Sequence, residues 1–70
     1  MLNPLNRQVN GHHYRNFVIQ PVEFIHKNKI GFIAGNIIKY ACRYEKKGQL
    51  ESDLKKIIHY AELLIQLEKK

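Results

Sequence analysis

Residues 50–68 read LESDLKKIIHYAELLIQLE, and this stretch decides the fold class. Its apolar residues recur with the 3.6-residue period of an α-helix, which predicts a helix that begins near residues 50–52 and ends near Glu68. Seven of them share one stripe of that helix, which we expect to face a core: Leu50, Leu54, Ile57, Ile58, Ala61, Leu64 and Ile65.

A second apolar stripe lies beside the first on the same helix and consists of Tyr60, Leu63 and Leu67. In a monomer this stripe would be an exposed apolar patch, and such patches mark interaction sites. We interpret it as a contact between subunits. The alternative is that the N-terminal arm folds over it.

Two further helices are expected before this one. Pro21 suits the first turn of a helix over about residues 21–28, and the chain then breaks at Asn28 and Gly31. A helix over about residues 32–47 follows, with Gly48 as a left-handed stop. The sequence therefore predicts an all-α fold. It consists of an N-terminal arm over residues 1–20 and a single helical domain over residues 21–70, in which a hairpin of two helices carries a short extra helix.

Stability is a problem for a chain of 70 residues, because a domain this small buries only about 60% of the surface of its unfolded chain. Its single cysteine excludes an internal disulfide, and its four histidines lack the spacing of a zinc site. We therefore expect no metal and no cofactor, and we expect homo-oligomerisation to complete the fold.

The charge is strongly basic, with 12 Lys and Arg against 6 Asp and Glu, for a net charge of +6. Such a balance indicates a polyanionic partner, which is a nucleotide, a nucleic acid or an anionic membrane surface. No apolar run predicts a signal peptide or a membrane span, and a lone cysteine is typical of a reducing compartment. We expect a soluble, cytoplasmic protein with no membrane partner.

The helix expected over residues 32–47 carries the most informative pattern. Asn36, Lys39 and Arg43 share one face, and Lys47 follows one turn further on. Amide, ammonium and guanidinium groups in such a line suit phosphate binding, although a solvated basic helix face is the alternative. Gly35 borders the line and indicates close approach by a ligand or another backbone.

Two other places hold candidate site residues. His13 and Tyr14 belong to a polar and aromatic cluster in the arm that can grip phosphate or stack on a base, although such clusters more often serve packing. Asp53 either serves the first turn of its helix or orients Arg43 or Lys39 from across a site. Neither a phosphate loop nor a dinucleotide-binding fingerprint is present, so the pattern supports anion binding and does not by itself predict catalysis.

Several spaced motifs agree in order with a known family. Residues 13–14 read HY, 20–23 QPVE, 32–43 FIAGNIIKYACR, 46–48 KKG and 53–60 DLKKIIHY. In these motifs the chain resembles small tailed-phage proteins described as phage nucleotide kinases, over about residues 12–68. The resemblance implies a nucleoside monophosphate kinase of an infected bacterial cell. It also implies that the matching motif residues bind nucleotide phosphates: His13, Tyr14, Asn36, Lys39, Arg43 and Lys47.

The residues and the resemblance together indicate three possible functions. The first is sequestration of a nucleotide at or near a subunit interface, including a cyclic oligonucleotide immune signal, which would make the protein an anti-defence sponge. We favour it because the chain is minimal and offers no carboxylate pair to hold Mg²⁺. The second is the kinase. The third, DNA or RNA binding, fits the charge but lacks a recognition-helix signature.

Overall fold

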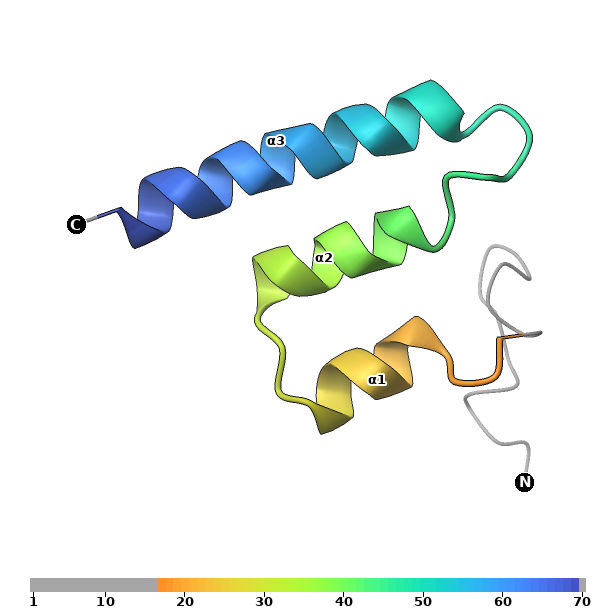
Figure 1. Cartoon of the computed structure of the whole chain (residues 1–70), viewed down its shortest axis with the longest axis horizontal. Helices are drawn as coiled ribbons and strands as arrows, with labels where there is room; N and C mark the ends of the chain where they lie inside the picture. Colours follow the sequence, from red (N-terminus) through yellow and green to blue (C-terminus); the bar gives the residue numbers. More distant parts are fainter. Residues whose placement is uncertain (1–16, 70) are drawn as a thin grey trace.

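The computed structural model describes residues 17–69, which form three α-helices and no strand (Figure 1). These helices are α1 (Pro21–Lys27), α2 (Phe32–Ala41) and α3 (Leu50–Glu68). They lie in a row in which α2 stands between α1 and α3, and α2 and α3 form a hairpin (Figure 1). The predicted all-α fold is confirmed. His13 and Tyr14 lie outside the described residues.

Helix α1 begins and ends close to the predicted positions. Pro21 occupies its first turn, where the missing N–H leaves no hydrogen bond unmade. At its end the backbone N–H of Lys29 donates to the carbonyl oxygen of His26, and that of Ile30 donates to Ile25. This pair of bonds is a Schellman motif, and it places Lys29 rather than a glycine in the left-handed region, with φ of 54°.

Helix α2 ends at Ala41, so the prediction that it continues to Lys47 was wrong. Beyond it the chain forms turns in which N–H groups bond to carbonyl oxygens three residues earlier, as from Arg43 to Tyr40 and from Lys46 to Arg43. Such bonds tighten the chain and replace the helical pattern. Gly48 is left-handed as predicted, with φ of 78°, but it lies in the connection just before α3.

Helix α3 has the predicted bounds, but the stripe that faces α2 differs from the predicted one. Asp53 is completely buried, and Ile57, Ala61 and Leu64 on the same face are half-buried. Four residues expected in the core are instead exposed: Leu50, Leu54, Ile58 and Ile65. The packed face is thus rotated toward Asp53, because its carboxylate pairs with Arg43, two residues beyond the end of α2.

No hydrophobic side chain among residues 17–69 is fully buried. A row of helices is a single layer, whereas a hydrophobic core needs at least two packed layers. The predicted core is therefore absent from one copy of the described chain. Within the same residues, no helix has the length and apolar character needed to cross a membrane.

Candidate functional site: a cation cluster around Tyr40

Three cationic side chains gather around the ring of Tyr40 near the C-terminal end of α2. The Nζ atoms of Lys39 and Lys56 each lie 5.1 Å from the ring centroid, and the guanidinium carbon of Arg43 lies 4.7 Å from it. A π-face attracts cations through its quadrupole, so Tyr40 offsets part of their mutual repulsion. We call Lys39, Arg43 and Lys56 the cation cluster.

Arg43 is held in place by Asp53 across the hairpin. Its Nη2 and Nε atoms donate to the two carboxylate oxygens, at 2.8 and 3.1 Å. The Asp53 side chain is fully buried and that of Arg43 is 22% exposed. A bidentate pair fixes the plane of the guanidinium, so the charged end of the Arg43 side chain has a defined orientation in the site. Both features predicted for Asp53 are present: it lies in the first turn of α3, and its carboxylate pairs with Arg43.

Tyr60 supports the cluster from α3. Its ring stacks on that of Tyr40, with centroids 6.1 Å apart and planes inclined by 19°. Such offset pairs are worth about 0.5–1.5 kcal/mol beyond the area they bury. Tyr60, predicted as a subunit contact, therefore packs within its own chain. Of the other two residues of that stripe, Leu63 is half-buried like Tyr60, and Leu67 is 69% exposed.

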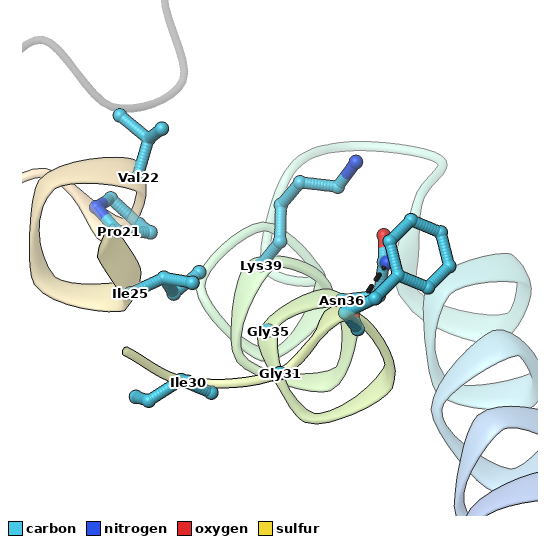
Figure 2. A pocket seen from close by; sticks show the side chains of 9 residues that line it. Pro21, Val22, Ile25, Ile30, Gly31, Gly35, Asn36 and Lys39 are labelled. Carbon is cyan, nitrogen blue, oxygen red and sulfur yellow. Dashed lines mark hydrogen bonds between the residues drawn. The ribbon is translucent and has the colours of Figure 1, made fainter. Parts of the chain in front are cut away.

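A hollow of about 230 Å³ lies beside the cluster, between α1 and α2 (Figure 2). Figure 2 shows Lys39 at its edge, with the ammonium extended away from the axis of α2. The wall is mostly apolar and includes the following residues: Pro21, Val22, Ile25, Ile30, Phe32 and Gly35. Asn36 also lines it, and its amide nitrogen donates to the carbonyl oxygen of Phe32 at 2.8 Å.

Gly35 is buried where α1 meets α2. A Cβ atom at this position would lie 3.1 Å from Cγ2 of Ile25, which is tighter than nearly all side-chain contacts. The glycine thus lets the Ile25 side chain approach the backbone of α2. The expected reason for this glycine was a ligand or another backbone, and the structure shows a side chain of α1 instead.

The structure brings together part of the predicted site. Asn36 and Lys39 line the hollow, and Lys39 and Arg43 belong to the cation cluster. Lys47 is exposed in the turn between α2 and α3, because the helix that would have aligned it ends at Ala41.

Lys56 was missed as a site residue. Its position three residues after Asp53 was the available signal, because residues at that spacing share one face of a helix. Cys42 is half-buried beside the cluster, and burial raises the pKa of its thiol, which lowers the thiolate fraction at neutral pH. Over residues 17–69, no three His, Cys, Asp or Glu side chains gather in a way that would hold a metal ion.

Comparison with known proteins adds one finding. No curated protein and no solved structure matches the chain. Residues 9–62 match the model of a protein family of unknown function, DUF3310. That match spans most of the 70 residues, including all of α1 and α2 and the cation cluster, so the chain belongs to the DUF3310 family.

Proposed function

We propose that the protein binds a nucleotide, with phosphate at the cation cluster and the base in the hollow between α1 and α2. The observation that carries this proposal is the position of Lys39, which belongs to both places. A ligand that occupies both needs an anionic part joined to a largely apolar part. Nucleotides have this composition.

The cation cluster suits the phosphate. Lys39 and Lys56 lie on different helices, and because both ammonium groups are 5.1 Å from one ring centroid, they are at most about 10 Å apart. Over that distance their positive potentials overlap and favour an anion between or above them. Arg43 adds a guanidinium whose orientation Asp53 fixes, and charge-assisted bonds to phosphate are about twice as strong as neutral ones.

The hollow suits the base. Sites that enclose a whole ligand usually have volumes of about 300–1,000 Å³, and this hollow has about 230 Å³, so it accommodates part of a nucleotide. Its apolar wall would cover the faces of a base, and Asn36 lies where an amide oxygen would meet an edge or a hydroxyl.

Sequestration is the form of binding that we favour over phosphoryl transfer. A kinase places a general base or an orienting carboxylate beside the attacking oxygen. Asp53 is the carboxylate in the cluster, and it is fully buried with both oxygens bonded to Arg43. The ligand class includes cyclic oligonucleotides, which serve bacteria as immune signals, and holding one would act against host defence. A nucleoside monophosphate kinase is the competing proposal.

Calorimetric titration with mono-, di- and cyclic nucleotides tests binding. Lys39→Ala and Lys56→Ala should each weaken the tightest ligand by about ten- to a hundredfold, since a bond to a charged group contributes about 1.5–3 kcal/mol. Lys69→Ala is the matched control: it removes the same charge from an exposed position at the end of α3 and should leave affinity unchanged. Unchanged affinity in both cluster variants would refute the proposal.

A fragment of a nucleotide tests the phosphate half of the site separately from the base half. Ribose 5-phosphate should compete at the cluster yet bind more weakly than AMP, because it leaves the hollow empty. Equal affinity would remove the base from the proposal and leave a phosphate site alone.

Incubation with ATP and each nucleoside monophosphate tests the kinase. We expect the nucleotides to be recovered unchanged by chromatography. Steady formation of diphosphates, abolished in Lys39→Ala, would replace sequestration with phosphoryl transfer.

A further inference from the structure

Helix α3 carries an apolar seam that residues 17–69 leave largely uncovered. Leu54, Ile58 and Ile65 are 38%, 59% and 67% exposed, and Ala61 between them is half-buried. Together these four residues are spaced by four, three and four positions. That is the spacing of the two inward positions of a coiled-coil heptad, which form a continuous line along one side of a helix. We call these four residues the α3 seam.

The seam differs from the stripe that the sequence suggested as a subunit contact. Tyr60 of that stripe stacks on Tyr40 within the chain, whereas the seam lies on the opposite flank of α3. The three helices form a single row, so within the part of the chain that the structure describes no second layer of helices packs on either broad face (Figure 1). A hydrophobic core would form if another layer packed on this flank.

We propose that the second layer is another copy of the same chain, packed seam to seam with α3 antiparallel to α3 about a two-fold axis. The axis lies level with about residue 59, midway along the seam. Leu54 then meets Ile65 of the second copy, and Ile58 meets Ala61. Every member of the seam finds an apolar partner, so the match is self-complementary.

The charges beside the seam fix the direction. Lys55 and Glu62 both adjoin it, seven residues apart on the same side of the helix, and both are exposed. The same two-fold axis brings Lys55 of one copy beside Glu62 of the other, twice in the dimer. In a parallel pair the corresponding neighbours of these charges are apolar, namely Leu50 for Lys55 and Ile57 for Glu62. Lys55 also pairs with Glu51 in its own helix at 2.8 Å, and this exposed bond can exchange for the one across the interface.

Sedimentation of the full chain over a roughly hundredfold range of concentration tests the dimer. Ile58→Asp should raise its dissociation constant by about a hundredfold or more, because two-fold symmetry places each buried charge in the interface twice. Leu67→Asp is the control, since Leu67 is also exposed, at 69% against 59% for Ile58, but lies on the other flank. Circular dichroism checks that both variants stay helical.

A charge exchange tests the direction without touching the apolar contact. Lys55→Glu and Glu62→Lys should each weaken the dimer by about tenfold, since each change turns two attractions into two repulsions, and the double variant should restore it. A wild-type monomer at all concentrations, which would follow if residues 1–16 covered the seam, overturns the proposal. So does a dimer that Leu67→Asp dissociates and Ile58→Asp does not. Failure of the exchange to restore the dimer overturns the antiparallel arrangement.

Discussion

Two neighbouring parts of α3 differ in which side chains they bury. Near the start of the helix, the Asp53 carboxylate is fully buried and pairs with a guanidinium that lies over the ring of Tyr40. One residue further on, the α3 seam begins, and there leucine and isoleucine side chains stay in contact with water. A polar group inside and aliphatic groups outside reverse the usual order in a folded protein.

The difference separates two causes of burial. Asp53 is buried because bidentate bonds to Arg43 offset its loss of water, and this holds within a single copy. Aliphatic residues have no such specific partner and become buried only where another surface meets them. Burial of Asp53 therefore depends only on contacts within one chain, whereas burial of the α3 seam depends on a contact with another surface.

Removal of the buried carboxylate is the strongest test of this contrast. Asp53→Ala leaves the guanidinium of Arg43 without its partner, and we expect a loss of about 3 kcal/mol in the free energy of unfolding, at the low end for buried pairs because Arg43 keeps some exposure. Urea titration followed by circular dichroism at fixed protein concentration measures it. The exposed pair of Glu51 and Lys55 gives the control, since Glu51→Ala should cost no more than about 0.5 kcal/mol. If the two variants lost the same unfolding free energy, the buried pair would stabilise the chain no more than the exposed one.

The ring pair beneath the cluster gives a smaller effect. In a double-mutant cycle of Tyr40→Leu and Tyr60→Leu, the coupling should be about 1 kcal/mol, as is found for stacked aromatic pairs. Unfolding free energies of the four proteins supply the measurement. A coupling near zero would mean that the two rings are neighbours without a favourable interaction between them.

A substitution outside both regions should stabilise the protein. Lys29 has a left-handed φ of 54°, which costs a residue with a Cβ atom about 1 kcal/mol. Lys29→Gly should recover that amount, whereas Lys29→Ala, which keeps the Cβ atom, should not. If thermal or urea unfolding shows the two variants to be alike, the turn is not strained. A stabilised background would also keep Asp53→Ala folded enough for measurement.

The seam should give the smallest effect in a dilute sample. Ile58→Ser changes a side chain that is 59% exposed, to a residue of similar helix propensity, so the monomer should lose no more than about 0.5 kcal/mol. Unfolding at the lowest practical concentration measures this. A loss of about 2 kcal/mol or more there would show that Ile58 packs within its own chain.

Helix type and the bounds of α1 and α3 were predictable because local signals mark them. Pro21 starts α1, and the period of apolar residues defines α3. The early end of α2 was not predictable in this way. No glycine or proline lies between Gly35 and Gly48, and the helix gives way to turns in the segment where Arg43 bonds to Asp53, a tertiary contact.

The site was predictable only where its residues lie in one segment of the chain. One helix period aligned Asn36, Lys39 and Arg43, but Lys56 joins them from another helix, and periodicity within one segment says nothing about such a meeting. The core stripe was placed wrongly because apolar periodicity does not reveal which part of a wide apolar surface meets the neighbour. Here a single aspartate inside that surface decided the rotation of α3.

The short connection between α2 and α3 has a kinetic consequence. Arg43 and Asp53 are ten residues apart, and closing a loop of that length takes about 10–100 ns. Chains dominated by such local contacts fold in microseconds to milliseconds. The hairpin should therefore close long before two copies meet, so that refolding shows a fast phase independent of concentration and, if the seam pairs, a slower phase whose rate rises with concentration.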